Sequence, residues 1–374
     1  MKLFAMTAPG LEGILARELK QLGMKIGGSV AGGVEFTGDA GELAKANLWS
    51  RVANRIVIRM DEFHANSFHE LERRAKKVEW GRYLSAGSPV RFRVTCRKSK
   101  LYHSDAVAER LANAAIRSTG AKIDAIDDDE ESEEAHGQLF IVRIANDICT
   151  ISADSSGALL HRRGYRQAIA KAPLRETIAA AMLIVSEWDT TRPLVDPMCG
   201  SGTIAIEGAM MARRMAPGVG RSFAFEQWPE HDSGKWNAMV DEARQAALPS
   251  AGAPIIASDR DAGAVAAAAS NAQRAGVANE IEIRELPLSA VEFPSPPGWI
   301  VSNPPYGHRV GEAAPLKNLY ARLGTILRDK AKGYVLALLS ADRSLEAQLR
   351  MDLHEVFRTN NGGIPVRLVT GESA

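Results

Sequence analysis

The C-terminal half of the chain alternates short apolar segments with segments of helical character. The apolar segments are "LVDP", "PIIASD", "EIEIRE", "GWIVSN" and "GYVLALL", which begin at residues 194, 254, 280, 298 and 333. Parallel strands covered by helices on both faces have such continuous apolar runs. The pattern predicts an α/β fold with a doubly wound, mostly parallel sheet. Two last strands around "NNGG", at 355–359 and 364–369, would add an antiparallel edge hairpin and bring the sheet to seven strands.

The first 158 residues show a different order of segments. Leucines at helical spacing in 11–23, followed by two short strand-like segments, predict a small α+β unit over residues 1–60. A second α+β unit is predicted over 61–158. Its expected elements are a helix at 67–84, a strand at 89–100, a helix at 104–120 capped by Ser104, and a strand pair at 138–154 that turns at Asn146 and Asp147. A basic connector at 159–171 leads to the third part, 172–374.

The charge of the chain is unevenly distributed. The net charge of the 374 residues is only +1, but residues 1–171 carry 26 Lys and Arg against 22 Asp and Glu. Seven of those acids stand in one tract, "DDDEESEE" (127–134), which we interpret as a loop without a role in binding. The first half therefore presents a basic surface interrupted by one acidic loop.

The cysteines and the apolar segments exclude several classes of protein. The three cysteines, Cys96, Cys149 and Cys199, are far apart and form no CxxC pair, which argues against a disulfide framework or a zinc site. The histidines are scattered, so no metal is expected. No apolar run is long enough for a membrane span, and the charged start lacks a signal-peptide pattern. We expect a cytoplasmic protein without an obligate protein partner.

A glycine-rich turn follows the first strand of the third part. In "LVDPMCGSGTIAIEGA" (194–209) the strand ends at Asp196, and an apolar helix opens after the turn. Gly200 and Gly202 let the backbone pass close to a bound ligand, because they carry no Cβ. The same residues also satisfy the dinucleotide pattern G-x-G-x-x-A.

An acid ends the next strand, in "ASDRDAGAVAAAASNAQRAG" (257–276). Asp259 is placed to accept hydrogen bonds from ribose hydroxyls, and Asp261 can cap the following helix. A dinucleotide-binding unit has its ribose acid about 20 residues after the glycines, whereas Asp259 follows Gly202 by 57 residues. The segment between them includes Trp228 and Trp236, which we expect to be packing residues. This spacing weakens a nicotinamide-dependent oxidoreductase as an interpretation.

The segment "SNPPYG" (302–307) indicates the chemistry. The amino group on a nucleobase is a poor nucleophile, because its lone pair is delocalised into the ring. The Asn303 side-chain carbonyl and the Pro304 backbone carbonyl can accept from that amine and align it with a methyl donor, while the prolines hold the loop rigid. Tyr306 gives an extracted base a face on which to stack.

Together these motifs resemble class I S-adenosylmethionine-dependent methyltransferases with an NPPY-type motif. Specifically, the chain is similar to the THUMP-domain RNA methyltransferases that modify the guanine-N(2) amine. The resemblance covers nearly the whole chain, through "APGLEGILARELKQLG", "RKSKLYHSDAVAERL", the segment 155–183, "NPPYGHRVG" and "NGGIPVRL". It implies a ferredoxin-like domain at 1–60, a THUMP RNA-binding domain at 61–158, a linker at 159–171 and a Rossmann-like methyltransferase domain at 172–374.

The resemblance also implies a set of site residues. The catalytic loop would be Asn303, Pro304, Pro305 and Tyr306. S-adenosylmethionine would bind at Asp196, Met198, Cys199, Gly200, Ser201, Gly202, Thr203, Asp259 and Arg260. The acid that the family usually has near the adenine amine is missing, since Leu286, Pro287 and Leu288 stand there, and that contact is left unassigned.

Structured RNA, ribosomal or transfer, is the expected partner. Residues 73–100 contain ten Lys and Arg against the single acid Glu79, and such a surface neutralises phosphates. The residues expected to bind RNA are Arg91, Arg93, Arg97, Lys98, Lys100, Arg162, Arg163 and Arg166. Two other hypotheses stay open: a DNA adenine or protein glutamine methyltransferase that uses the same loop, and an RNA-binding protein without activity.

Overall fold

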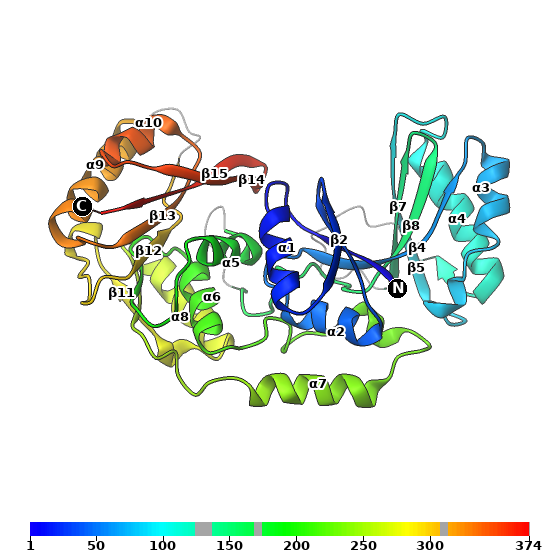
Figure 1. Cartoon of the computed structure of the whole chain (residues 1–374), viewed down its shortest axis with the longest axis horizontal. Helices are drawn as coiled ribbons and strands as arrows, with labels where there is room; N and C mark the ends of the chain where they lie inside the picture. Colours follow the sequence, from blue (N-terminus) through cyan, green and yellow to red (C-terminus); the bar gives the residue numbers. More distant parts are fainter. Residues whose placement is uncertain (124–136, 168–173, 307–312, 374) are drawn as a thin grey trace.

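A computed structural model describes residues 1–123, 137–167, 174–306 and 313–373. The chain forms an elongated molecule with two separate sheets (Figure 1). The sheet at 194–372, called the catalytic sheet after the activity predicted for it, lies at one end. Helices α3 (Phe68–Ala75) and α4 (Ser104–Thr119), which cover the other sheet, lie at the opposite end. The predicted acidic loop at 127–134 lies outside the described residues. Within the described ranges, no helix is both long and apolar enough to cross a membrane.

The N-terminal sheet has eight strands in the order β2-β3-β1-β4-β8-β7-β5-β6. Its strands are β1 (Lys2–Met6), β2 (Lys25–Val30), β3 (Gly33–Thr37), β4 (Arg55–His64), β5 (Pro89–Arg97), β6 (Lys122–Ile123), β7 (Gln138–Ala145) and β8 (Ile148–Asp154). Its helices are α1 (Glu12–Gln21), α2 (Ala40–Trp49), α3 (Phe68–Ala75) and α4 (Ser104–Thr119). Helix α1 packs against β2 and β3, whereas α4 packs against β5 and α3.

Strand β4 joins the two predicted α+β units into one sheet. Its first residues pair with β1, with Leu3 opposite Ile58. The rest of β4 pairs with β8, and the register runs as far as His64 opposite Ile148. The boundary expected at residue 60 therefore falls within a strand that both units share.

Two local predictions in this sheet were wrong. The helix expected over 67–84 ends at Ala75, because Trp80 turns back into the core and its indole N–H donates to the Ala75 carbonyl at 2.9 Å. Trp80 is fully buried and meets Phe140 edge to face. Ser104 is the first helical residue of α4 instead of its cap, whereas the turn at Asn146 and Asp147 is confirmed. Strands β1 and β2 were not predicted.

The catalytic sheet has the predicted doubly wound form, in the order β11-β10-β9-β12-β13-β15-β14. Its strands are β9 (Leu194–Asp196), β10 (Ile255–Asp259), β11 (Ile281–Glu285), β12 (Trp299–Ser302), β13 (Val335–Ser340), β14 (His354–Asn361) and β15 (Ile364–Glu372). The first five are parallel, and β15 runs antiparallel to β13, as expected for the edge hairpin. The α-helices are α5 (Glu176–Val185), α6 (Thr203–Ala212), α7 (Ser233–Gln245), α8 (Ala262–Arg274), α9 (Ala313–Lys330) and α10 (Arg343–Glu346).

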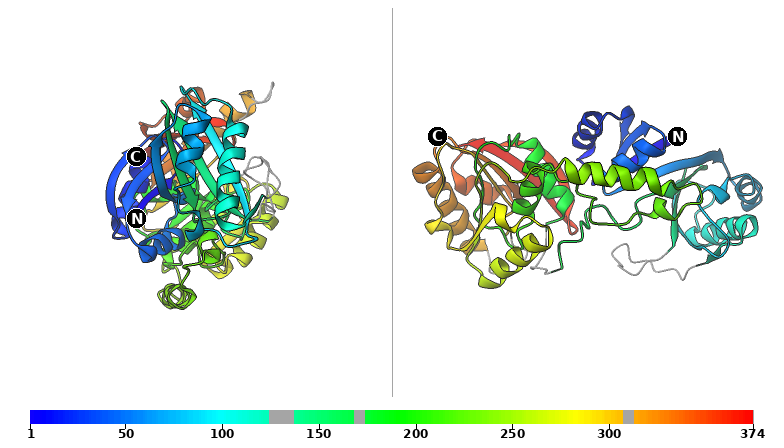
Figure 2. Two further views of the ribbon diagram at one scale, coloured as in Figure 1. Left: turned by 90° about the vertical axis from the view of Figure 1, so that its right-hand side faces the viewer. Right: turned by 90° about the horizontal axis from the view of Figure 1, so that it is seen from below.

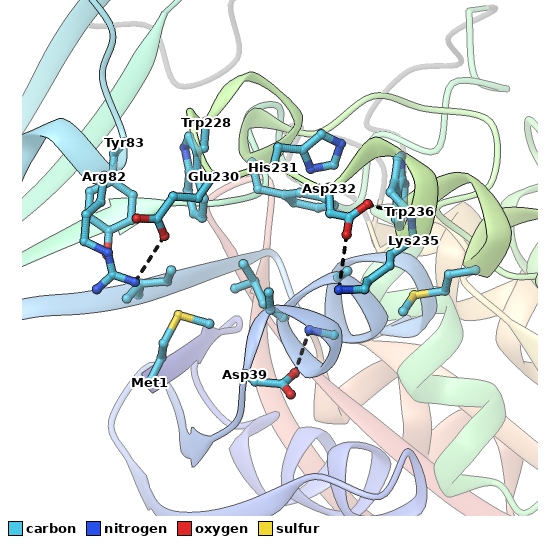
Figure 3. A pocket seen from close by; sticks show the side chains of 17 residues that line it. Met1, Asp39, Arg82, Tyr83, Trp228, Glu230, His231, Asp232, Lys235 and Trp236 are labelled. Carbon is cyan, nitrogen blue, oxygen red and sulfur yellow. Dashed lines mark hydrogen bonds and ion pairs between the residues drawn. The ribbon is translucent and has the colours of Figure 1, made fainter.

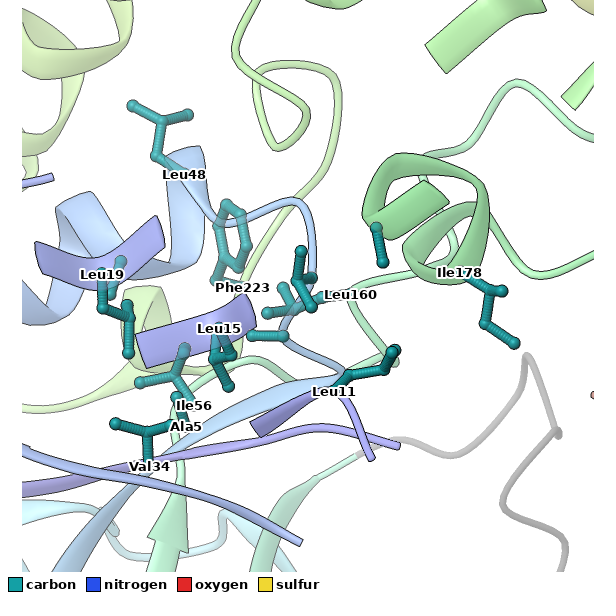
Figure 4. Packing of buried hydrophobic residues seen from close by; sticks show 14 of the residues in the cluster. Ala5, Leu11, Leu15, Leu19, Val34, Leu48, Ile56, Leu160, Ile178 and Phe223 are labelled. Atoms are coloured by element: carbon teal, nitrogen blue, oxygen red, sulfur yellow. The ribbon is translucent and has the colours of Figure 1, made fainter. Parts of the chain in front are cut away.

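The segment between α6 and β10 reaches back to the N-terminal sheet. Helix α7 runs alongside α2 there (Figure 2). Trp236 is buried against Phe225, and Trp228 donates its indole N–H to Gln138 of β7 at 2.6 Å, so both tryptophans pack as expected. Phe223 from this segment and Ile178 from α5 belong to the same core as the leucines of α1 (Figure 4). The N-terminal sheet and the catalytic domain therefore share one continuous core.

Candidate active site

The glycine-rich turn is built to leave its outer side open. Gly200 and Gly202 both have positive φ, 52° and 83°, which L side chains rarely adopt. A Cβ on Gly202 would lie 3.0 Å from the Cβ of Ala268 in α8, so this glycine permits close packing of the helix. A Cβ on Gly200 would meet no heavy atom within 4 Å. Gly202 therefore allows α8 to pack closely against the turn, whereas Gly200 faces open space.

Hydrogen bonds from neighbouring elements hold the turn. The Cys199 amide donates to the Ser258 carbonyl at 2.9 Å, and the Asn271 side chain donates to the Ser201 carbonyl at 3.0 Å. The Cys199 thiol is buried, and burial raises its pKa, so it has no reactive thiolate. Met198 is half-buried against the apolar cluster below the sheet. The side chains of Met198 and Cys199 therefore serve the turn by their size and packing, not by sulfur chemistry.

Asp196 connects this turn to the "SNPPYG" loop. It is fully buried, and its Oδ1 accepts from the Ser302 hydroxyl at 2.7 Å. Burial raises the pKa of Asp196 to about 7, although the Ser302 hydrogen bond acts in the opposite direction. Strands β9 and β12 are parallel neighbours, so both motifs leave the same edge of the sheet. Sequence reasoning missed Ser302, although it directly precedes Asn303.

Asp259 lies beside the turn, at the end of β10. One carboxylate oxygen accepts from the Gly200 amide at 3.0 Å and the other from the Asp261 amide at 3.0 Å. Asp261 caps α8 by accepting from the Ala264 amide at 2.8 Å, which confirms its predicted capping role. Asp259 stays half-buried, while Arg260 points into solvent. Asp259 therefore keeps a partly exposed carboxylate at the edge where a ribose would lie.

The edge fits the cofactor that the resemblance implies. Helix α6 begins at Thr203 with Gly202 as its N-cap, and no side chain caps its amides. An open turn, a helix N-terminus and a neighbouring carboxylate are the elements of a nucleoside-binding edge in this class of sheet. On the adenine side the Leu286 amide donates to the Asp259 carbonyl at 2.9 Å, and Glu285 is exposed. The contact to the adenine amine stays unassigned.

The loop after β12 presents an acceptor that the protein leaves unused. The Asn303 Oδ1 atom is buried and has no hydrogen-bond partner among the described residues. Pro304 is buried and Pro305 exposed. The half-buried Tyr306 accepts at its hydroxyl from the Asn361 side-chain amide at 3.1 Å. A buried amide oxygen without a partner destabilises the fold, and such atoms in native proteins call for a functional explanation.

The predicted RNA-binding residues separate into two groups. Arg97, Lys98 and Lys100 are exposed at the end of β5 and in the loop that follows. Beyond them Tyr102 is 69% exposed, with the His103 ring centroid 4.1 Å from its own. Arg91 and Arg93 lie on β5 and are half-buried.

The connector arginines are placed differently, and the prediction for Arg163 was wrong. Its side chain is 2% exposed, and its Nε lies 3.5 Å from Oε1 of the fully buried Glu207. It also donates to the Arg51 carbonyl at 2.6 Å. Arg166 pairs with the buried Glu176 at 3.1 Å, and Arg162 is half-buried. Arg163 is therefore a structural cation between the two sheets, because the Glu207 carboxylate and the Arg51 carbonyl already hold its guanidinium.

A cavity of about 500 Å³ lies away from this edge, between α2, Tyr83 and the segment before α7 (Figure 3). Its apolar wall includes Tyr83 and Trp236. Ion pairs stand at its rim, Arg82 with Glu230 at 3.6 Å and Lys235 with Asp232 at 3.2 Å. None of the predicted site residues lines it. Nor do the described residues form a cluster of His, Cys, Asp and Glu that could hold a metal.

Known families match both ends of the chain. The RMKL-like methyltransferase domain, UPF0020, matches residues 163–370, and the RlmL ferredoxin-like domain matches residues 2–57. A protein of Synechocystis sp., "Putative RNA methyltransferase slr0064", is 34% identical over 373 residues, which cover 99% of this chain and 96% of that protein. The ribosomal RNA large subunit methyltransferase K/L of Pseudoalteromonas atlantica is 34% identical over 372 residues.

The chain spans about half the length of the K/L relative, since the match covers 97% of this chain but 52% of that protein. Among solved structures, SMU.472, crystallised in complex with S-adenosylhomocysteine, has a TM-score of 0.88 and 29% identity. That match covers 100% of this chain and 98% of SMU.472. These findings confirm the family and the cofactor predicted from the motifs. The chain belongs to the RMKL-like methyltransferase family and is an S-adenosylmethionine-dependent methyltransferase.

Proposed function

We propose that the enzyme methylates the N2 amine of a guanosine in structured RNA, either ribosomal RNA of the large subunit or transfer RNA. The observation that carries this proposal is the Oδ1 of Asn303, which is buried and unpartnered within the part of the chain that the structure describes. It follows directly after Ser302, whose hydroxyl is bound to Asp196 of the cofactor turn. An acceptor in this position would hold an amine beside the cofactor.

Alignment is the main task of these residues. S-adenosylmethionine supplies a methyl group that its sulfonium already activates. Asn303 Oδ1 and the Pro304 carbonyl would accept hydrogen bonds from the two N–H groups of the amine and so turn its lone pair toward that methyl group. Tyr306, whose hydroxyl is held by Asn361, would stack on the base. The new N–C bond forms as the S–C bond breaks, and the amine then gives up one proton to solvent.

The cofactor residues would act from the other side. We assign the methionine side of the cofactor to the turn from Asp196 to Thr203, and its ribose to Asp259. Arg260 is exposed and Cys199 buried, so both would contribute backbone rather than side chain. Their roles can be tested by cofactor binding alone, without RNA.

Support for RNA comes from two sources. The Synechocystis and Pseudoalteromonas relatives carry the names of RNA methyltransferases. The exposed cations Arg97, Lys98 and Lys100 project from the N-terminal sheet, with Tyr102 beside them. We propose that the ferredoxin-like part (1–60) and the THUMP part (61–158) bind RNA at a distance from the target base. The enzyme would work in the cytoplasm, where those RNAs are.

The test is a comparison of modified nucleosides. RNA from a deletion strain and its parent is digested and analysed by mass spectrometry, and we expect N2-methylguanosine to fall in the deletion strain only. A plasmid with the wild-type gene should restore it, whereas Asn303→Ala should not, although that variant keeps its affinity for S-adenosylhomocysteine within a few-fold. Unchanged N2-methylguanosine with a loss of methylated adenine in DNA, or of methylated glutamine in protein, would replace our proposal. Failure to bind the cofactor in calorimetry would favour an RNA-binding protein without activity.

A further inference from the structure

A second unused acceptor lies next to the catalytic loop. Asn361 ends β14 and is 3% exposed. Its Nδ2 donates to the Tyr306 hydroxyl at 3.1 Å, while its Oδ1 is buried and has no hydrogen-bond partner in the described ranges. The Tyr306 hydroxyl therefore occupies the Nδ2 end of the Asn361 amide, whereas no described residue binds its Oδ1 end. The sequence pattern alone assigns no role to Asn361.

The topology brings Asn361 to the active edge. Strand β15 runs antiparallel to β13, so the turn of the β14–β15 hairpin, with Asn361 opposite Ile364, lies at the edge where the parallel strands end. Figure 1 shows this hairpin extending from the catalytic sheet toward α1. A Cβ on Gly10, two residues before α1, would lie 1.8 Å from the Arg358 carbonyl of β14, so the hairpin is held against the N-terminal domain. Asn361 therefore lies on a hairpin that packs against the N-terminal domain.

The two buried acceptors belong to Asn303, three residues before Tyr306, and to Asn361, whose Nδ2 donates to the Tyr306 hydroxyl. Their polarity matches one base edge. Guanine carries N–H donors on adjacent positions, at N1 and at the N2 amine. Adenine has an acceptor at N1, and a carbonyl oxygen opposite that acceptor would be repelled. Enzymes that extract a base read it by hydrogen bonds to this edge. With Asn303 Oδ1 assigned to the N2 amine, the second oxygen has the polarity that N1–H requires.

We propose that Asn361 determines the specificity for guanine, with its Oδ1 accepting from N1–H of the target base. The inference deepens the proposed function and depends on it. Tyr306 would fix the orientation of the Asn361 amide, because its hydroxyl occupies the Nδ2 end. A site built to bind an N–H group rejects analogues that lack it, since the buried acceptor is then left unpaired.

The experiment uses the full-length enzyme and a synthetic RNA stem-loop centred on the mapped target nucleotide. One RNA carries guanosine there, and the other carries 2-aminopurine, which keeps the N2 amine but has an acceptor at N1. We expect wild-type enzyme to methylate the guanosine RNA roughly 10- to 100-fold faster in kcat/KM. In Asn361→Ala the guanosine rate should fall and this ratio should approach one. Affinity for S-adenosylhomocysteine should not change.

Two controls separate recognition from support of the loop. Asn360→Ala removes the neighbouring, exposed asparagine and should keep both the rate and the ratio. Tyr306→Phe removes the hydroxyl that fixes the Asn361 amide. Because the Asn361 oxygen is still present, this variant should lower the rates with both RNAs and reduce the ratio only in part. If Asn361→Ala keeps the wild-type ratio, the assignment of N1–H to Asn361 is wrong. If wild-type enzyme methylates neither RNA, the proposed function itself fails, and this inference with it.

Discussion

Two basic segments of the chain look alike in sequence, but one is buried in the structure and the other is exposed. In "HRRGYR" (161–166) the side chain of Arg163 is 2% exposed and faces a fully buried carboxylate. In "CRKSK" (96–100) Arg97, Lys98 and Lys100 are all exposed. The first segment joins the two sheets, and the second ends a strand at the surface. A cluster of cations therefore indicates a phosphate-binding surface only when the fold leaves it in water.

The largest expected difference between the two segments is in stability, when one arginine of each is replaced by methionine. Among the described residues, Arg163→Met leaves the buried carboxylate of Glu207 with Arg51, at 3.8 Å, and the Tyr165 hydroxyl, at 3.2 Å. Removing one partner of a buried pair costs about 3–5 kcal/mol. We expect a much lower Tm in thermal unfolding for Arg163→Met and almost no change for Arg97→Met. Equal Tm values for the two variants would show that Arg163 has no structural role.

The burial of Arg163 could not be predicted from its sequence. Its partner Glu207 lies 44 residues later, inside the apolar helix "TIAIEGAMMA", where a lone acid is easily passed over. The motif residues were different. Asp196, Asp259 and Asn303 each end or directly follow an apolar strand, and parallel strands bring such ends to one edge. Local patterns therefore predicted the sheet and the cofactor turn, while contacts between distant segments were missed, such as Ser302 with Asp196 or Trp228 with Gln138.

The second prediction concerns the exposed segment and its contribution to RNA binding. Replacing both Lys98 and Lys100 by Glu should weaken RNA binding about 10-fold or more at moderate salt. It should also reduce the slope of log K against log salt by about two, since each contact contributes about 0.9 for a duplex. Fluorescence anisotropy at several salt concentrations measures both quantities, and Tm should stay within about 1 °C.

Lys235→Glu is the matched control, because Lys235 is 87% exposed but lies on α7, away from β5. Its salt slope should equal that of the wild type. An unchanged slope in the double variant would remove Lys98 and Lys100 from the RNA-binding surface.

The buried segment also contains a titratable group, and the third prediction concerns its effect on stability. His161 is 4% exposed. Burial lowers the pKa of His161 to about 3 from its ordinary 6.5, and the nearby Arg175, Arg166 and Arg163 act in the same direction. Below pH 6.5 the unfolded chain binds a proton here that the folded chain refuses, so stability falls as pH drops from about 6.5 toward 3.

At pH 5 the lowered pKa of His161 reduces the free energy of unfolding by about 2 kcal/mol. The carboxyl of Glu176, whose pKa burial raises to about 7, has the opposite sign, because its folded form holds a proton that the unfolded form loses above pH 4.5. It is present in wild type and in His161→Gln alike, so the difference between the two proteins isolates His161. We expect the Tm of His161→Gln to fall less than that of the wild type between pH 7.5 and pH 5. Parallel decreases in Tm would mean that His161 takes up its proton inside the fold, and that the connector is more open to water than its buried arginines indicate.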